Sequence, residues 1–230
     1  IFKYYMDTII LSLGGSILIP DKPDYFFLKE FKNFVINNLD NYKFIIVCGG
    51  GKTNSYYNEA AKRVSNISSE NLDWIGIMAS RLNAEYVRSV FGDLAHDRVI
   101  INPTKKISTK KKILIGAGWI PGRSSDYVAV LLAKKYNSTS VINLTKLSHV
   151  YDKDPLNHKN AKKLFNLTWK EYIKIVGTKW SPRLNSPFDP IASVFAKDNK
   201  MKVAILKGTD LVNVQNYLEN KNFEGTIISG

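Results

Sequence analysis

The chain has 230 residues, of which 44% are hydrophobic and 12% aromatic. These values fit one large α/β domain or two small lobes, and they exclude a disordered chain. No apolar run is long enough to span a bilayer, and no signal-peptide pattern is present, so we expect a soluble protein without a membrane partner. The single cysteine, Cys48, lies in an apolar stretch and cannot form an internal disulfide. This fits a reducing compartment and predicts a cytoplasmic location.

The formal net charge is +13, from 33 Lys and Arg against 20 Asp and Glu. Such a charge raises the question of nucleic-acid binding. The densest basic cluster, Lys105-Lys106 with Lys110-Lys111-Lys112, has no interleaved aromatic residues on which bases could stack. We interpret the charge as a solvated surface that also attracts nucleotide phosphates, and we expect no specific nucleic-acid partner. Nucleic-acid binding remains an alternative.

Stretches of β-forming residues alternate with stretches of helical periodicity. In chain order, strands are expected at residues 8–13, 44–48, 98–101, 112–115, 140–144, 202–206 and 226–229. Helices are expected at residues 25–39, 54–63, 72–90, 127–135, 169–176, 191–197 and 211–218. Thr168 and Glu171 give the capping-box pattern at the start of one helix. Residues 20–24, 151–155 and 177–190 are expected to be turns or loops.

This alternation predicts the fold class. Strand followed by helix throughout the chain is typical of an α/β protein with a three-layer arrangement, in which an open, mostly parallel sheet has helices on both faces.

Three of the predicted strands end in glycine-rich loops: Gly14-Gly15, Gly49-Gly50-Gly51 and residues 116–122. Loops at the carboxyl ends of parallel strands meet along one edge of the sheet, where ligands bind in this class. Glycine lets the backbone approach an anion, and helix N-termini present unpaired amides to it. The spacing matches neither a P-loop nor a dinucleotide fingerprint, so one loop alone fits a tight turn equally well. Together the three loops predict a site for several phosphate groups.

Five motifs occur in a fixed order along the chain. They are Leu11-Ser12-Leu13-Gly14-Gly15-Ser16, Cys48-Gly49-Gly50-Gly51-Lys52, residues 72–84, Pro121-Gly122-Arg123-Ser124-Ser125-Asp126, and residues 150–155. In this order they resemble the amino acid kinase family, and within it the uridylate (UMP) kinases, especially the archaeal-type branch. The resemblance covers essentially the whole chain. It implies ATP-dependent phosphorylation of UMP to UDP in pyrimidine nucleotide biosynthesis. It also implies one domain, 1–230, divided into a UMP-binding lobe of about 1–135 and an ATP-binding lobe of about 136–230.

The resemblance also implies roles for individual residues. The implied UMP-binding residues are Gly50, Asp73, Gly118, Trp119, Ile120, Pro121, Gly122, Arg123 and Ser124, with Asp73 on the ribose. The implied ATP-binding residues are Ser12, Leu13, Gly14, Gly15, Ser16, Gly51, Ser55, Thr145, Tyr151 and Asp154, with Tyr151 against adenine. The implied catalytic residues are Asp126, Lys52 and Arg123. Mg²⁺ would be carried by the nucleotide phosphates, with no metal site made by the protein alone.

A homo-oligomer is implied as well, typically a hexamer built as a trimer of dimers, with the helices after the first two strands at the interface. Phosphoryl transfer depends on charge neutralisation and alignment, and the UMP phosphate is already an anionic nucleophile. No catalytic histidine is therefore expected, and we interpret His96, His149 and His158 as surface or loop residues.

The chain departs from the family pattern at four places. Ser12 stands where many members have lysine, and Ser55 stands where an arginine is usual, so that Lys52 or Arg123 would have to replace a phosphate contact. Residues 145–151 lack the family's Asn, Asp and Gly, and residues 177–190 hold three prolines and Trp180 in place of a glycine-rich loop. Two alternatives follow from these departures. One is a nucleotide-binding or storage protein of the same fold with weak or no kinase activity; the other is a kinase of another small phosphate acceptor.

Overall fold

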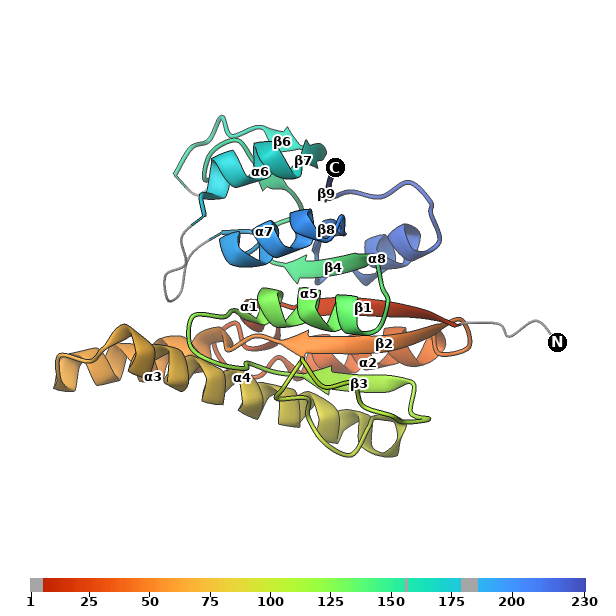
Figure 1. The fold of residues 1–230 in the computed structure, drawn as a ribbon, viewed down its shortest axis with the longest axis horizontal. Helices are drawn as coiled ribbons and strands as arrows, with labels where there is room; N and C mark the ends of the chain where they lie inside the picture. Colours follow the sequence, from red (N-terminus) through yellow and green to blue (C-terminus); the bar gives the residue numbers. More distant parts are fainter. Residues whose placement is uncertain (1–5, 156, 179–185) are drawn as a thin grey trace.

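A seven-stranded sheet forms the centre of the computed structural model, which describes residues 6–155, 157–178 and 186–230 (Figure 1). The strand order is β3-β2-β1-β4-β8-β9-β7, and every neighbouring pair is parallel except β8 and β9. The strands are β1 (Asp7–Leu13), β2 (Tyr42–Cys48), β3 (Ile113–Gly116), β4 (Ser140–Thr145), β7 (Asn166–Thr168), β8 (Lys202–Lys207) and β9 (Thr226–Ser229).

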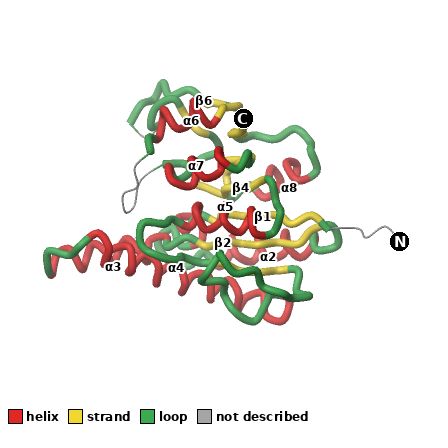
Figure 2. Tube along the Cα trace, viewed as in Figure 1, coloured by secondary structure: helices red, strands yellow, loops and turns green. Residues whose placement is uncertain are grey.

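Helices cover both faces of this sheet (Figure 2). One face packs against α1 (Gly15–Leu18), α2 (Tyr25–Asn37), α4 (Ser69–Phe91) and α8 (Leu211–Leu218), and α3 (Gly51–Val64) lies along α4. The other face packs against α5 (Ser125–Lys135), α6 (Trp169–Val176) and α7 (Pro190–Asp198). Successive side chains of a strand point to opposite faces, so Phe44 and Ile46 enter the first core while Ile45 and Val47 enter the second. The predicted three-layer, mostly parallel α/β fold is confirmed.

The strand register brings the predicted glycine loops to one level of the sheet. Leu13 at the end of β1 pairs with Cys48 at the end of β2 and with Leu144 near the end of β4, and Val47 pairs with Gly116 at the end of β3. The loops that follow these strands therefore begin side by side. This edge is where the candidate site lies.

Most predicted elements are present, with shifted ends. Thr168 caps α6 in a capping box with Glu171, as the pattern predicts. The helix expected at residues 54–63 is α3, which begins three residues earlier, at Gly51. Five short elements were not expected: α1, the 3-10 helix η1 (Gly92–Leu94), the two-residue strands β5 (Val150–Tyr151) and β6 (Lys163–Leu164), and the three-residue strand β7. They are too short to leave a periodic pattern.

The strand expected at residues 98–101 is wrong. Only Ile100 pairs with the sheet, as an isolated bridge to Gly116 with hydrogen bonds to Ile115 and Ala117. Pro103 follows shortly after and has no N–H to extend a ladder.

The loop expected at 177–190 falls partly on residues 179–185, which lie outside the described part of the chain. The division into lobes at residue 135 stays a prediction. Within the described ranges, no helix is both long and apolar enough to cross a membrane.

Candidate active site

A cavity of about 230 Å³ opens where the predicted glycine loops meet. Its walls come from the start of α3, the first half of α4, the loop after β3, the start of α5 and the segment before α7. The lining residues are Gly50, Asn54, Asn58, Leu72, Asp73, Gly76, Ile77, Ser80, Gly118, Arg123, Ser124, Ser125, Asp126, Ser186 and Asp189.

The loops after β1 and β2 fit together because both lack side chains. A Cβ on Gly15 would lie 2.1 Å from the Gly51 nitrogen, and a Cβ on Gly51 would lie 2.4 Å from the Gly15 oxygen. Gly51 also has a φ of +59°, which favours glycine. No side chain caps α3, whose N-cap Gly50 lines the cavity. The N-terminus of a 14-residue helix is therefore left for an anion in the cavity.

Two buried polar side chains of α4 hold the floor of the cavity in place. Ser80 Oγ donates to the Cys48 oxygen over 2.7 Å and accepts from the Gly118 N–H over 2.8 Å. Asn83 Nδ2 donates to the oxygens of Gly49 and Gly50, over 2.8 Å and 3.0 Å. These contacts tie the loops after β2 and β3 to one helix, which explains why polar residues stand in the apolar stripe of α4.

Asp73 joins α4 to the loop after β3. Its Oδ2 accepts the Gly122 N–H over 2.7 Å. Arg81, two turns further along α4, donates to the oxygens of Gly118 and Trp119 over 3.2 Å and 3.1 Å. The loop is thus held against α4 at both of its ends.

Asp126, at the start of α5, is the best-connected acid of the site. Its Oδ1 accepts from Ser12 Oγ over 2.7 Å, and its Oδ2 accepts from the Asp189 N–H over 3.1 Å. Burial raises the pKa of Asp126 from 3.8 to about 7, and the nearby Asp189 carboxylate adds to this while the Ser12 hydrogen bond opposes it. Proton binding by Asp126 is therefore favoured at a higher pH than in an exposed aspartate.

Asp189, the N-cap of α7, brings a second acid to the same place. Its Oδ1 accepts from the Ala192 N–H over 2.5 Å, while its Oδ2 is buried and has no hydrogen-bond partner within the described chain. Burial raises the pKa of this carboxyl as well. Tyr172 fixes the segment by accepting from the Phe188 N–H over 2.7 Å and donating to the Phe188 oxygen over 2.8 Å.

The structure brings many of the predicted site residues together. Those that line the cavity are Gly50, Asp73, Gly118, Arg123, Ser124 and Asp126, while Ser12, Gly15, Gly51, Trp119 and Gly122 contact these residues or their loops. Of the two cations expected to replace the missing arginine at Ser55, Arg123 lines the cavity, with its guanidinium carbon 4.8 Å from the centre of the Tyr127 ring. Lys52 is exposed and lies over the Tyr56 ring at 5.4 Å.

The residues expected around the ATP base lie elsewhere. Thr145, Tyr151 and Asp154 are outside the cavity lining, in β4, in β5 and in the segment that follows. His149 was expected to be a surface or loop residue. It lies in a loop, but its side chain is fully buried, and the centre of its ring is 5.0 Å from that of Phe165. Burial lowers the pKa of His149, so it is neutral at pH 7.

Sequence reasoning missed several lining residues. Gly76 and Ser125 lie inside predicted motifs but were given no role, Asn54 and Asn58 follow the Cys48–Lys52 motif, and Asp189 was noted only at the start of a helix. Asn58 is 1% exposed, which the sequence alone does not indicate.

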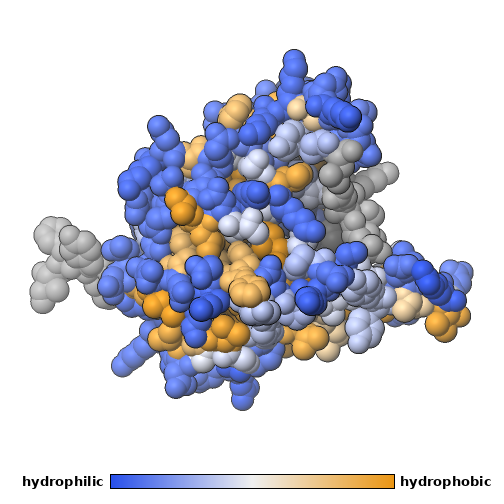
Figure 3. All heavy atoms as spheres, turned by 180° about the vertical axis from the view of Figure 1, so that it is seen from behind, coloured by the Kyte–Doolittle hydropathy of each residue, from blue (hydrophilic) through white to orange (hydrophobic). Residues whose placement is uncertain are grey.

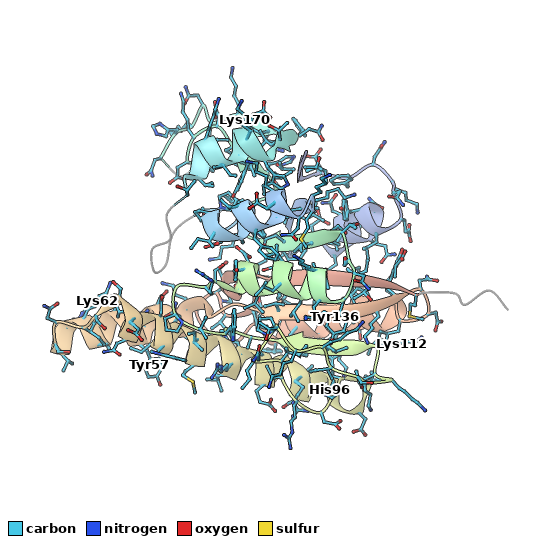
Figure 4. All side chains as sticks on the ribbon, in the orientation of Figure 1. Tyr57, Lys62, His96, Lys112, Tyr136 and Lys170 are labelled. Atoms are coloured by element: carbon cyan, nitrogen blue, oxygen red, sulfur yellow. The ribbon has the colours of Figure 1, made fainter. Side chains whose placement is uncertain are left out.

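The basic cluster lies away from the cavity. Lys112 precedes β3 and donates to the Leu39 oxygen over 2.7 Å, at the amino-terminal end of the sheet. Figure 4 shows Lys112 and Tyr136 at this end, opposite Tyr57 and Lys62 on α3.

Comparisons with known proteins show the family of this chain. A model of the amino acid kinase family matches residues 7–207. A uridylate kinase of Thermococcus kodakarensis is 30% identical over 223 residues, covering 96% of this chain and 98% of that protein. A uridylate kinase of Methanoregula boonei is 32% identical over 235 residues, covering 97% and 96%.

Among solved structures, the uridylate kinase of Archaeoglobus fulgidus superposes with a TM-score of 0.81 at 28% identity, covering 97% of this chain and all of that one. The UMP kinase of Ureaplasma parvum, at 19% identity and a TM-score of 0.77, shares the fold. The family predicted from the motifs is thereby confirmed: this chain belongs to the amino acid kinase family.

Proposed function

We propose that this protein transfers the γ-phosphoryl group of ATP to UMP, forming UDP and ADP in pyrimidine nucleotide biosynthesis. One observation carries the proposal. Asp73, Arg123 and Asp126 come from separate elements and line one cavity, at the N-terminus of α3, which no side chain caps. The archaeal relatives that match over nearly the whole chain are named uridylate kinases, which supports UMP as the acceptor.

In this reaction an oxygen of the UMP phosphate forms a bond to the γ-phosphorus, and the bond from that phosphorus to the β–γ bridging oxygen breaks. No proton has to be removed, because the nucleophile is already an anion. The amides of Gly50 and Gly51 and the Arg123 guanidinium would hold phosphate oxygens and stabilise charge in the transition state. Asp126 would position the Ser12 hydroxyl and the Asp189 amide around the transferred group.

Magnesium carried by the nucleotide phosphates belongs to this proposal. The residues present fit such an ion, since the Asp189 Oδ2 is a buried oxygen without a partner within the described chain and lines the same cavity as Asp126. Hard divalent cations prefer carboxylate and phosphate oxygens. When bound, the ion would neutralise phosphate charge, and Asp189 and Asp126 are the side chains that would hold it.

We further propose a cytoplasmic homo-oligomer, with a hexamer of three dimers as the expected form. Large hydrophobic side chains are exposed on the two helices that follow the first two strands: Tyr25 and Phe26 on α2 are 61% and 68% exposed, and Tyr57 on α3 is 66% exposed. Hydrophobic side chains gather on the face where α2 and α8 lie (Figure 3). Exposed apolar side chains that gather on one face support an interface there. Sedimentation of the purified protein would measure the assembly.

A coupled assay of ADP release tests the proposed function. The protein would be incubated with ATP, Mg²⁺ and, in turn, UMP, CMP, AMP and GMP. We expect the highest kcat/KM with UMP. Faster turnover with another acceptor would show that this acceptor, and not UMP, is the substrate. Tight ATP binding without any ADP release would favour a nucleotide-binding or storage protein.

A further inference from the structure

Two asparagines of α3 line the cavity without a role in the proposed reaction. Asn54 and Asn58 are four residues apart and therefore lie on one face of the helix. Asn58 Nδ2 donates to Asn54 Oδ1 over 2.7 Å. This leaves Asn58 Oδ1, which is buried and has no hydrogen-bond partner among the residues that the structure describes.

Asn54 is held in place from both sides. A Cβ on Gly50 would lie 2.9 Å from Asn54 Cβ, and a Cβ on Gly76 would lie 3.2 Å from both Asn54 Nδ2 and Oδ1. The two glycines therefore make the space that Asn54 fills. The hydrogen bond from Asn58 Nδ2 to Asn54 Oδ1 holds the Asn58 amide with its own Oδ1 free of Asn54.

A buried carbonyl oxygen without a hydrogen-bond partner costs free energy. Because Asn58 lines the cavity, a ligand that donates a hydrogen bond to its Oδ1 would remove this cost. A phosphate is ruled out as that donor, because it is an anion that only accepts. Asp73 lines the same cavity from α4, and its carboxylate also only accepts. A vicinal diol presents two O–H donors, and these two acceptors line the same cavity from α3 and α4.

We propose that Asn58 Oδ1 accepts a hydrogen bond from a ribose hydroxyl of the acceptor nucleotide and makes the site selective for ribonucleotides over deoxyribonucleotides. Asn54 acts as the positioning residue for Asn58. This inference rests on the proposed function, since it places a nucleoside monophosphate in the cavity. Sites built to bond a substrate hydroxyl discriminate strongly against analogues that lack it, because the buried polar group is then left unpaired.

The test compares UMP, 2′-deoxy-UMP and 3′-deoxy-UMP in the wild type, in Asn58→Leu and in Asn71→Leu. Asn71 is an exposed residue of α4 outside the cavity and serves as the matched control. We expect Asn58→Leu to lower kcat/KM for UMP about 10- to 100-fold while changing it less than about threefold for one of the two deoxynucleotides. Asn71→Leu should leave all three unchanged.

An equal loss for all three acceptors in Asn58→Leu would overturn the proposal. The proposal would also be overturned if Asn58→Leu lowered kcat/KM for UMP but left it unchanged only for N3-methyl-UMP, because that result would place Asn58 on the base. Asn54→Ala provides a second variant that keeps Asn58, and it should show the same selective loss at a smaller size. Calorimetry measures the dissociation constants of the three acceptors and so tests the same discrimination without turnover. If the wild-type protein bound UMP but phosphorylated no nucleotide, the proposed kinase activity would be contradicted. The binding measurements would still test the role of Asn58.

Discussion

The two sides of the proposed site differ in how they are built. The acceptor side, made of Gly50, Asp73 and residues 118–126, forms a cavity whose walls are joined by buried hydrogen bonds from Ser80 and Asn83. The donor side, residues 145–154, lies outside this cavity, and its loop contains a buried histidine. On the proposed assignment, the acceptor geometry is fixed by the fold, whereas donor recognition depends on a loop whose residues depart from the family pattern.

Replacing the carboxyl of Asp126 should have the largest effect, because Asp126 lines the cavity and accepts a hydrogen bond from Ser12 in the first glycine motif. We expect Asp126→Asn to lower kcat about 10²- to 10³-fold, with a smaller change in the KM for UMP. The Asn amide would also face the Asp189 N–H, which the carboxylate now accepts over 3.1 Å. Asp198→Asn, an exposed change at the end of α7, is the control. A kcat within threefold of the wild type would remove Asp126 from the reaction.

The same carboxyl should make stability depend on pH. Its pKa rises from 3.8 to about 7 on folding, so between these values the folded state binds more protons than the unfolded state. The contribution of this carboxyl to stability is therefore fully present below about pH 4 and is lost as pH rises to about 7. At 1.36 kcal/mol per pKa unit, the free energy of unfolding falls by about 4 kcal/mol at most over this range.

Denaturant unfolding of the apo protein between pH 4 and pH 8 measures this slope. In Asp126→Asn the slope should flatten over the same range. A variant whose unfolding free energy falls with pH as steeply as that of the wild type would show that another group is responsible.

Asp73 tests the acceptor side alone. We expect Asp73→Asn to raise the KM for UMP about 10- to 50-fold and to leave the KM for ATP within twofold, because a neutral amide is a weaker acceptor for the ribose and for the Gly122 N–H. Initial rates with each substrate varied in turn supply both constants. Glu70→Gln, exposed and one turn earlier on α4, should change neither. A parallel rise in both KM values would mean that the two sides are not separate.

His149 tests the donor side and should give the smallest effect. His149→Gly restores the residue type that the family pattern has here, but it removes the ring contacts with Phe165 and Tyr151 at 5.0 Å and 6.5 Å. We expect the KM for ATP to rise about two- to fivefold with no change in the KM for UMP. His158→Gly, an exposed change in the same segment, should have no effect. A change in UMP affinity would contradict the separation.

Much of the fold could be predicted from the sequence because buried strands such as β2 are continuous apolar runs that end at glycine. The segment at 98–101 was misread because an apolar pair such as Val99-Ile100 looks the same whether it makes a ladder or a single bridge. Residues on the loops near Asp73 and Asp126 could be named from the motifs. Asn58 and Asp189 could not be assigned, because their position in the cavity depends on how α3 meets α4 and how α7 meets α5.

A structure with UMP and a non-hydrolysable ATP analogue bound tests the central claim most directly. The account predicts UMP in the cavity, with its ribose between Asp73 and Asn58 and its phosphate toward Gly50 and Arg123. The triphosphate should lie beside Gly14 and Gly15. UMP bound against Tyr151, or ATP filling the cavity lined by Asp73, would contradict the assignment of the two sides.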